Sequence, residues 1–353
     1  MLNLGDQALS PEERLRYARH LTLPGVGEEG QLKLKAAKVL VIGAGGLGSP
    51  ILNYLGAAGV GHITVLDGDV VEESNLQRQT IHRMEDIGRN KAESATDALR
   101  RLNPYIAVEG VKTHLTHLNA IELFQAHDLV IDGTDNFATR YLSNDAAELT
   151  STPLVWGTIS QFQGQLSVFD PNRGPMLRDL FPEMPPADAV PSCAVGGVFG
   201  ALPGLVGSMM AIEALKHITG VGEVAVGKLV LLDALTTSMR TLTFTRDPGR
   251  APVEKLQPVD EPVTTTVEPQ GTLIDVRTPE ETALGVIPGA HLVPLAEIEE
   301  RGWEAVAPFV RDTTTFYCKS GMRSERAIKL IREHTEAELL NLQGGYVAWS
   351  ARN

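Results

Sequence analysis

The chain has 353 residues, which is enough for two domains. Hydrophobic residues make up 43% and charged residues 21%, a composition typical of globular proteins and not of disordered chains. There are 31 Lys and Arg against 44 Asp and Glu, and the resulting net charge of −13 argues against nucleic-acid binding through a broad basic face.

In chain order, the first part of the sequence alternates short apolar runs with helical patterns. A helix over 10–36 comes first, with Ser10 as its N-cap and Pro11 at its first position. We then expect strand 38–42, helix 47–58, strand 63–67, helix 90–101, strand 106–112, helix 117–126, strand 128–132, helix 136–149 and strand 153–158. This alternation predicts a Rossmann-like, doubly wound α/β domain with a mostly parallel sheet.

The following segments predict how this domain ends and what comes after it. Residues 171–192 contain six prolines, which predicts a long loop over the site. A helix over 200–218 and a hairpin of 227–233 and 239–245 complete a first domain assigned to residues 1–247. A Pro-rich linker over 248–264 follows. Residues 265–353 predict a small α/β domain built from strand 272–276, helix 278–284, strands 291–293 and 314–317, helix 322–333, strand 338–341 and helix 344–351.

The termini and the cysteines indicate the compartment. The first 21 residues lack the basic start and apolar core of a signal peptide. The longest apolar stretch, 195–212, contains six glycines and prolines, so we expect no membrane span and a cytoplasmic protein. Cys193 and Cys318 are too few for a disulfide framework or a Cys-rich zinc site, although one disulfide remains arithmetically possible.

The first strand leads into a candidate nucleotide site. Gly43, Gly45 and Gly48 form a G-x-G-x-x-G turn that opens a helix, where backbone N–H groups approach phosphates. Asp67 ends the next strand, where a carboxylate accepts ribose hydroxyls. NAD is the default ligand of such a turn, but nothing in the sequence indicates a nicotinamide pocket. The next segments instead hold residues of the types that bind a triphosphate with Mg²⁺, namely Arg78, Lys91 and Asp135.

Taken singly, these charged residues have simpler interpretations. Arg78 or Lys91 alone is more often a solvated helix charge, and Asp135 alone could cap the helix that follows it. Their joint pattern is more specific. The chain resembles the MoeB/ThiF adenylating enzymes, relatives of ubiquitin-activating enzymes, over residues 10–247, in five segments that occur in this order: 16–20 (RYARH), 43–49 (GAGGLGS), 66–79 (LDGDVVEESNLQRQ), the helix that begins near Lys91, and 133–136 (GTDN).

This resemblance implies an enzyme that binds MgATP and adenylates the C-terminal glycine of a small ubiquitin-like sulfur carrier of the MoaD or ThiS type. Lys91 is expected to stabilise charge at the α-phosphate and Asp135 to hold Mg²⁺. Arg19 would reach the phosphates from a partner subunit, which implies a homodimer. The expected ATP-binding residues are Gly43, Gly45, Gly46 over the phosphates, Gly48, Asp67 at the ribose, Asp69, Ser74, Asn75 and Arg78 at the triphosphate, Leu76, Gln77, Lys91, Asp135 and Asn136.

One departure from the family pattern concerns zinc. Relatives commonly carry two C-x-x-C pairs that bind a structural zinc ion. These pairs would fall near Met176 and Asp179 and near Arg250 and Val253, where this chain has no cysteine. We therefore predict no structural zinc, and other contacts must then hold the 171–192 loop.

Cys318 lies between an apolar strand and a helix, in the segment FYCKSGMRS of residues 316–324. Converging backbone N–H groups and the helix dipole lower a thiol pKa at such a position, and Lys319 and Arg323 add positive charge. The simpler interpretation is a small buried cysteine without reactivity. The loop resembles that of rhodanese-type sulfurtransferases, and the resemblance extends over 265–353 with residues 273–277 (LIDVR), 287–291 (IPGAH) and 344–349 (GGYVAW).

The rhodanese resemblance implies that Cys318 carries a persulfide and that Arg323 attracts anionic sulfur donors. Asp275, Arg277 and His291 are interpreted as structural supports. Cys193 follows the Pro-rich loop, and its role stays undecided. It is either a buried structural residue or the cysteine with which fused adenylating and sulfurtransferase relatives handle the activated carrier.

Together these features predict a four-step reaction. The first domain binds ATP and the Gly-Gly tail of the carrier. The carrier is then adenylated with release of pyrophosphate, and a Cys318 persulfide attacks the acyl carbon. Cys193 or an external reductant then cleaves the acyl disulfide and frees a thiocarboxylate. A cysteine desulfurase or thiosulfate would supply the sulfur, and the fusion raises the local concentration of sulfur. The product would serve molybdopterin synthesis, or alternatively tRNA thiolation, thiamine or cysteine synthesis. An NAD-dependent oxidoreductase and a non-catalytic scaffold are the other classes considered.

Overall fold

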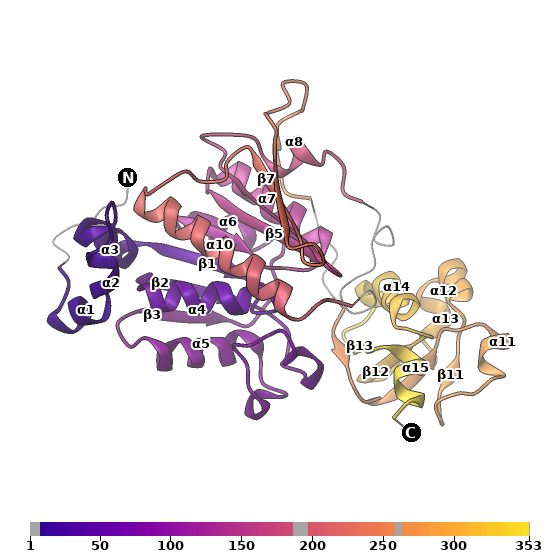
Figure 1. The fold of residues 1–353 in the computed structure, drawn as a ribbon. Coiled ribbons are helices and arrows are strands. Elements are labelled where there is room, and N and C mark those ends of the chain that lie inside the picture. The colour runs from indigo at the N-terminus through magenta and orange to yellow at the C-terminus, as the bar shows by residue number, and fades with distance from the viewer. Residues whose placement is uncertain (1–7, 186–196, 258–262, 353) are drawn as a thin grey trace. The chain divides into compact units, whose positions relative to one another are not determined.

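The computed structural model describes residues 8–185, 197–257 and 263–352 (Figure 1). The chain divides into two compact units, Met1–Val259 (unit 1) and Asp260–Asn353 (unit 2). The division falls inside the segment 248–264 that the sequence assigns to a linker. Within the described ranges, no helix is both long and apolar enough to cross a membrane.

Unit 1 is built on an eight-stranded sheet of order β3-β2-β1-β4-β5-β6-β7-β8. The pairs from β3 to β5 are parallel, and those from β5 to β8 are antiparallel. The doubly wound α/β fold expected from the sequence is confirmed, with a larger antiparallel part than expected. Its strands are β1 (Lys38–Ile42), β2 (His62–Leu66), β3 (Ala107–Val111), β4 (Leu129–Asp132), β5 (Leu154–Ser160), β6 (Gln163–Phe169), β7 (Lys228–Asp233) and β8 (Ser238–Thr243).

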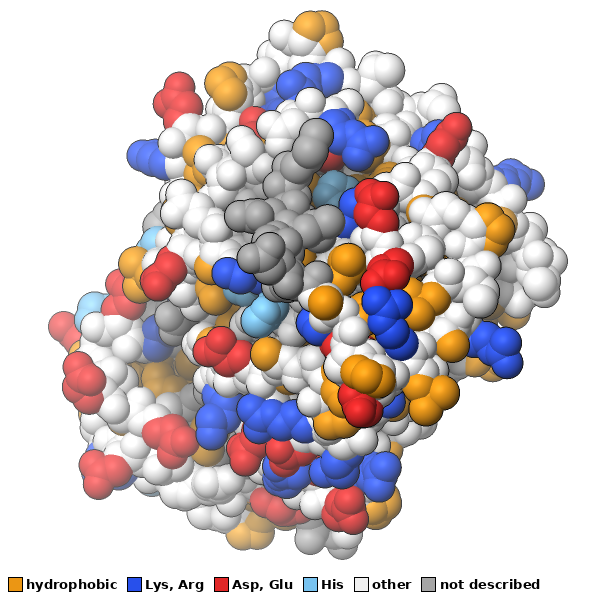
Figure 2. Space-filling view, turned by 90° about the vertical axis from the view of Figure 1, so that its left-hand side faces the viewer, with side chains coloured by type: hydrophobic (Ala, Val, Ile, Leu, Met, Phe, Trp, Pro, Cys, Tyr) orange, Lys and Arg blue, Asp and Glu red, His pale blue; other side chains and the backbone are white. Residues whose placement is uncertain are grey.

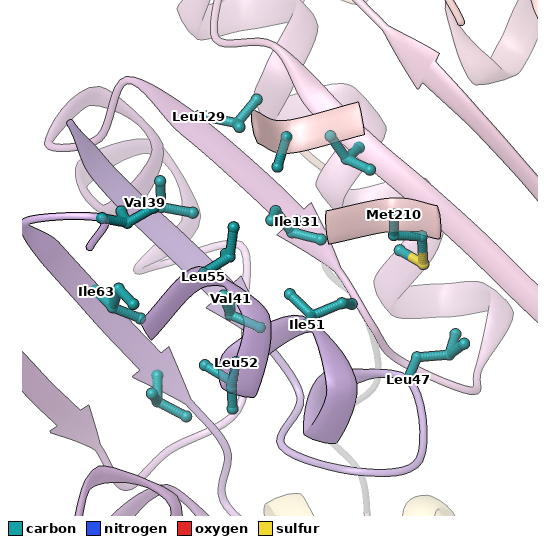
Figure 3. Packing of buried hydrophobic residues seen from close by; sticks show 14 of the residues in the cluster. Val39, Val41, Leu47, Ile51, Leu52, Leu55, Ile63, Leu129, Ile131 and Met210 are labelled. Atoms are coloured by element: carbon teal, nitrogen blue, oxygen red, sulfur yellow. The ribbon is translucent and has the colours of Figure 1, made fainter. Parts of the chain in front are cut away.

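Helices cover both faces of the parallel strands. The side chains of β1 alternate between two cores, with Val39 and Val41 in one and Leu40 and Ile42 in the other. Figure 3 shows the first core, where Val41 lies close to Leu55 and Ile51, and Ile131 lies close to Met210. After the exposed Lys38, the sequence of β1 is continuously apolar, as expected for a strand buried on both faces. The larger helices are α3 (Gly27–Ala36), α4 (Gly48–Ala58), α5 (Lys91–Leu102) and α10 (Ala201–Thr219) on the first core, and α6 (Ala120–Gln125) and α7 (Phe137–Thr150) on the second.

The helix predicted over 10–36 is instead three helices, α1 (Pro11–Arg16), α2 (Ala18–Leu21) and α3. Ser10 does cap the first of them, with its Oγ accepting the Glu13 N–H at 3.2 Å. The first break falls at Tyr17, whose buried hydroxyl accepts a hydrogen bond from Asn103 at 2.8 Å. The second lies near Gly25, whose φ of +84° favours glycine. Tertiary packing of Tyr17 thus overrides the continuous helical pattern.

Unit 2 has a five-stranded parallel sheet of order β11-β10-β12-β13-β9. Its strands are β9 (Thr265–Thr266), β10 (Thr272–Asp275), β11 (His291–Leu292), β12 (Thr313–Tyr317) and β13 (Glu338–Leu342). Its helices are α11 (Pro279–Thr282), α12 (Leu295–Arg301), α13 (Trp303–Val306), α14 (Met322–Ile331) and α15 (Gly345–Ser350). The small α/β domain is as expected, whereas β9, α12 and α13 were not predicted.

The surface agrees with the acidic composition of the chain. On the face shown in Figure 2, acidic and basic side chains are interspersed among the described residues, and no broad basic area stands out. Phosphate backbones are bound by clustered Lys and Arg. That the chain does not bind nucleic acid stays a prediction.

Candidate functional site

The Gly-rich turn, residues 43–48, lies between β1 and α4 and is shaped by backbone contacts. Gly43 has a φ of +88°, and its N–H donates to Leu66 O at 2.8 Å. A Cβ at Gly48 would overlap the carbonyl group of Gly43, so only glycine fits there. A Cβ at Gly133 would lie 3.2 Å from Gly48 N, which places the GTDN segment against the start of α4. The two segments that the sequence assigned to the nucleotide site therefore adjoin.

Two side chains of the SNLQRQ segment lie over this turn. A Cβ at Gly46 would come within 3.6 Å of Arg78 Cγ, and one at Gly45 within 3.6 Å of Gln79 Nε2. Gln79 is 5% exposed, and its Oε1 has no hydrogen-bond partner among the described residues. A buried amide oxygen without a partner is costly in a folded protein. Gln79 is thus a site residue that the sequence analysis missed, although it ends the motif that was singled out.

A buried lysine lies among three carboxylates beside the turn. Lys91 Nζ donates to Asp69 Oδ2 at 2.9 Å, and Lys91 is 8% exposed. Burial acts to lower the pKa of Lys91, but the charges of Asp69, Asp67 and Asp135 outweigh it, so the pKa is raised. Lys91 therefore carries a positive charge that is held in place before any substrate binds.

Asp67 links the turn to the end of β2. One of its carboxylate oxygens accepts the N–H of Ala44 at 2.8 Å and the other accepts that of Asp69 at 2.9 Å. Burial raises the pKa of Asp67. Each oxygen keeps a further lone pair, so the geometry remains compatible with the expected contact to a ribose.

In the GTDN segment, residues 133–136, one residue caps the following helix and another is left exposed at the site. Asn136 caps α7, with its Oδ1 accepting the Thr139 N–H at 2.8 Å. The capping role considered for Asp135 thus belongs to Asn136, and the Asp135 carboxylate is exposed. Below them the buried Asp132 accepts both the N–H and the hydroxyl of Thr134, at 2.9 and 2.6 Å, which orders the turn.

The 74–77 segment lies next to Arg78, whose Nη1 donates to Ser74 O at 3.2 Å. Asn75 is 6% exposed, and its Oδ1 accepts the Glu72 N–H at 3.2 Å. Leu76 is partly buried. The Gln77 amide contacts Val198 O at 3.5 Å, in the segment that follows the Pro-rich loop, and no described contact joins it to the Gly-rich turn.

One predicted site residue, Arg19, is not brought to this cluster by the described part of the chain. Arg19 is exposed on α2, which Figure 1 shows at the end of the sheet where β1 begins, whereas the Gly-rich turn follows the end of β1. A single chain therefore does not place Arg19 at the turn. Cys193 lies outside the described residues, and its role stays a prediction.

The four positions that the family resemblance assigns to zinc-binding cysteines are joined here by an ion-pair cluster. Arg250 Nε lies 2.8 Å from Asp179 Oδ1, and its Nη2 lies 3.0 Å from Glu148 Oε2. Asp179 also accepts the Met176 N–H at 2.7 Å, and Glu148 accepts the Val253 N–H at 3.2 Å. The predicted loop 171–192 also contains a helical turn, α8 (Leu177–Leu180), next to this cluster. The cluster ties the loop to the start of the predicted linker.

We expect Arg250→Met to destabilise unit 1 by about 2–4 kcal/mol, because it leaves two largely buried carboxylates without their partner. Arg240→Met on the exposed strand β8 should change the free energy of unfolding by about 0.5 kcal/mol or less. Denaturant titration measures both. A chelator should leave wild-type unfolding unchanged, whereas one zinc ion per purified chain would contradict this account.

In unit 2, Cys318 lies between β12 and α14, and its side chain is almost fully buried. The N–H of Gly321 donates to its Sγ at 3.1 Å. Burial acts to raise the pKa of this thiol, but the Ser324 hydroxyl and the backbone N–H groups of Ser324, Ser320 and Gly321 outweigh it, so the pKa is lowered. The loop therefore stabilises an anion on sulfur, as the sequence predicts.

A second layer of contacts holds this loop. Asn341 on β13 donates from Nδ2 to Gly321 O at 3.0 Å, and its Oδ1 lies 2.6 Å from Ser324 Oγ. The N–H of Tyr346 donates to Cys318 O at 2.8 Å from the first turn of α15. Asn341 was not predicted, because its partners come from another strand–helix junction and no local pattern marks it.

Two arginines near Cys318 are paired with carboxylates. Arg323 forms a two-bond ion pair with Glu281, with both N···O distances at 2.7 Å. Arg277 is buried against Asp275, with a shortest distance of 2.6 Å, as expected for a structural support. The His291 ring stacks on Phe309, with centroids 4.6 Å apart. That Arg323 attracts anionic sulfur donors stays a prediction, and its guanidinium is shared with Glu281.

The lowered pKa of Cys318 gives a test in pH. We expect its reaction with iodoacetamide to rise with pH through a midpoint below the ordinary thiol value, because only the thiolate reacts. Ser324→Ala should move the midpoint upward. Ser320→Ala should not, because only the backbone N–H of Ser320 contributes. Mass spectrometry of the Cys318 peptide follows the rate, and equal midpoints for wild type and Ser324→Ala would contradict the assignment.

Comparisons with known proteins agree with both units. Residues 17–251 match the ThiF family and residues 259–352 match the rhodanese-like domain. The probable adenylyltransferase/sulfurtransferase MoeZ of Mycobacterium tuberculosis is 46% identical, over 97% of this chain and 94% of that protein. The sulfur carrier protein adenylyltransferase of Thermus thermophilus is 53% identical, over 69% of this chain and 91% of that protein.

Solved structures support the fold of unit 1. The E. coli MccB structure with ATP has a TM-score of 0.58 and 20% identity, covering 67% of this chain and 73% of that chain. At this identity the likeness concerns the fold alone. The resemblances drawn from the RYARH-to-GTDN segments and from the Cys318 loop are both confirmed. The chain therefore belongs to the ThiF family, carries a rhodanese-like domain at its carboxyl end, and is an adenylyltransferase and sulfurtransferase.

Proposed function

We propose that this chain adenylates the C-terminal glycine of a ubiquitin-like sulfur carrier and then converts that carboxyl group into a thiocarboxylate with sulfur held on Cys318. The observation that carries the proposal is that one chain holds both reactive centres. Unit 1 places Arg78, Lys91 and Asp135 around a Gly-rich turn, and unit 2 holds a thiol of lowered pKa. The name of the Thermus relative supports a sulfur carrier as the substrate.

In the first step, a carboxylate oxygen of the carrier attacks the α-phosphorus of ATP. The bond from that phosphorus to the pyrophosphate oxygen breaks, and pyrophosphate leaves. Negative charge builds up on the phosphates, where Lys91 and Arg78 stabilise it. The backbone N–H groups at the start of α4 and the Gln79 amide complete the phosphate contacts.

The residues present also fit Mg²⁺, which usually binds to one or two carboxylates together with substrate phosphates. The exposed Asp135 carboxylate, close enough to Lys91 to influence its pKa, would hold the ion. When bound there, Mg²⁺ would neutralise part of the phosphate charge.

In the second half, the terminal sulfur of a Cys318 persulfide attacks the acyl carbon, and AMP leaves with the bonding electrons. The product is an acyl disulfide between the carrier and Cys318. A second thiolate then attacks the Cys318 sulfur, which releases the thiocarboxylate and leaves a disulfide. We propose Cys193 or an external thiol for this step, and an external dithiol then reduces the disulfide. These reactions need reduced thiols, which favours the cytoplasm.

We further propose a homodimer in which Arg19 of one subunit completes the site of the other. Within one chain, Arg19 lies on α2 at the far end of the sheet. The outer faces of α4 and α10 leave Tyr54, Leu205 and Ile212 more than half exposed, at 55%, 52% and 53%. Leu205 and Ile212 are seven residues apart on one helix face, an arrangement that suits a symmetric partner.

The direct test is carrier-dependent exchange of labelled pyrophosphate into ATP. MoaD-type and ThiS-type carriers ending in Gly-Gly are the probes, and the same carriers without the last glycine are the controls. Exchange with an intact carrier and none with its truncated form supports the proposal. No exchange with any intact carrier would overturn the adenylation half, and the carriers that react would indicate the pathway.

A further inference from the structure

Glu281 is held by three hydrogen bonds next to the Cys318 loop. Its two carboxylate oxygens accept hydrogen bonds from Nη1 and Nη2 of Arg323, each at 2.7 Å. One of these oxygens also accepts a hydrogen bond from the Thr278 N–H at 3.1 Å. The hydrogen bonds from Arg323 lower the pKa of Glu281 to about 2. The carboxylate is therefore charged at neutral pH.

This carboxylate shares the cation nearest the reactive sulfur. Arg323 lies on the first turn of α14, five residues after Cys318, and interacts with both Glu281 and the Cys318 sulfur. The remaining cation of the loop, Lys319, is exposed. A donor that approaches Cys318 thus meets an arginine whose charge is already balanced by a carboxylate on the other side.

We propose that Glu281 determines donor specificity: it favours sulfane-sulfur donors with at most one negative charge, such as a persulfide on a cysteine of another protein, over the thiosulfate dianion. This inference rests on the proposed role of Cys318 as the persulfide carrier. In each case the Cys318 thiolate attacks the sulfane sulfur and a new S–S bond forms. The donor's own bond to that sulfur breaks, and sulfite, a sulfinate or a thiolate leaves with the electron pair.

Two small donors that differ by one charge test the proposal. Thiosulfate is a dianion, and methanethiosulfonate is a monoanion that delivers the same sulfur. We expect Glu281→Gln in the full chain to lower KM for thiosulfate by about 3- to 10-fold, with cyanide as acceptor. KM for methanethiosulfonate should fall by only about 1.7- to 3-fold, the square root of the thiosulfate effect, because a single charge is repelled half as strongly.

Glu280→Gln is the matched control, because Glu280 is an exposed carboxylate on the same helix and has no described contact with Arg323. It should leave both KM values unchanged. Glu281→Asp keeps the charge while disturbing the geometry, so it should keep the wild-type ratio of the two KM values even if turnover falls.

The outcomes separate specificity from simple positioning. A thiosulfate KM that rises in Glu281→Gln, or equal changes for both donors, would overturn the inference and leave Glu281 as a support of Arg323. Retained turnover in Cys318→Ala would instead overturn the proposed function of Cys318, whatever Glu281 does. A fall in the thiosulfate KM that exceeds the fall for methanethiosulfonate, and that is absent from Glu280→Gln, supports the inference.

Discussion

Cys318→Ala should abolish sulfur transfer from thiosulfate to cyanide and leave carrier-dependent exchange of pyrophosphate into ATP at the wild-type rate. The loop that lowers the pKa of Cys318 has no function without the sulfur atom that it stabilises. Exchange depends on unit 1, which is a separate compact unit with its own cores. Both assays use the full chain.

The other cysteine provides the control for this experiment. Cys193→Ser should transfer sulfur to cyanide at the wild-type rate, because cyanide removes the persulfide sulfur without a second thiol. Its effect should appear only in formation of the carrier thiocarboxylate. Loss of exchange in Cys318→Ala would show that the two activities are not divided between the units as proposed.

Lys91→Ala should reduce carrier-dependent exchange by about 100- to 1,000-fold, because it removes a preorganised charge from the phosphates. Lys91 donates a hydrogen bond to Asp69 at 2.9 Å, so its removal could also disturb folding. The loss of exchange therefore reports on catalysis only if the variant unfolds at the same denaturant concentration as the wild type. Lys112→Ala is the matched control, since Lys112 is an exposed lysine that pairs with Glu93 on the same helix as Lys91. It should keep the wild-type rate.

The same variant tests the homodimer. Arg19→Ala and Lys91→Ala should each be nearly inactive, but mixed and exchanged subunits should regain about a quarter of wild-type activity, because half of the dimers then contain one intact site. Mixtures that stay inactive although hybrid dimers form would exclude a contribution of Arg19 across the interface. Sulfur transfer to cyanide should be unaffected in both variants.

Much of the fold follows from local patterns, and the exceptions have identifiable causes. The apolar run of β1 and the glycines after it predict a strand, a turn and a helix because no long-range information is needed. Strand β6, in contrast, has a polar start and Gly164 in its interior, so no alternating pattern marks it. It forms because a tight turn at Gln161, with a φ of +51°, folds it back onto β5.

The candidate site divides in the same way. The residues around the Gly-rich turn could be predicted from the sequence, because the strand, the glycines and the acidic residue Asp67 follow one another at fixed spacings. The ion pairs Glu281–Arg323 and Asp179–Arg250 could not be predicted from the sequence, because their members are 42 and 71 residues apart. Each member alone reads as an ordinary surface charge. Only the folded chain shows that Glu281 pairs with the arginine beside Cys318 and that the Asp179–Arg250 pair holds the 171–192 loop.

The ion-pair cluster around Arg250 also fits the chemistry of unit 2. Zinc held by thiolates is a soft site, and its sulfur ligands react with oxidants and with sulfane sulfur. If Cys318 carries a persulfide as proposed, such a site in the same chain would be exposed to that reactive sulfur. Arginine and carboxylates have no sulfur to modify, so the loop they hold keeps its structure however much reactive sulfur the enzyme handles.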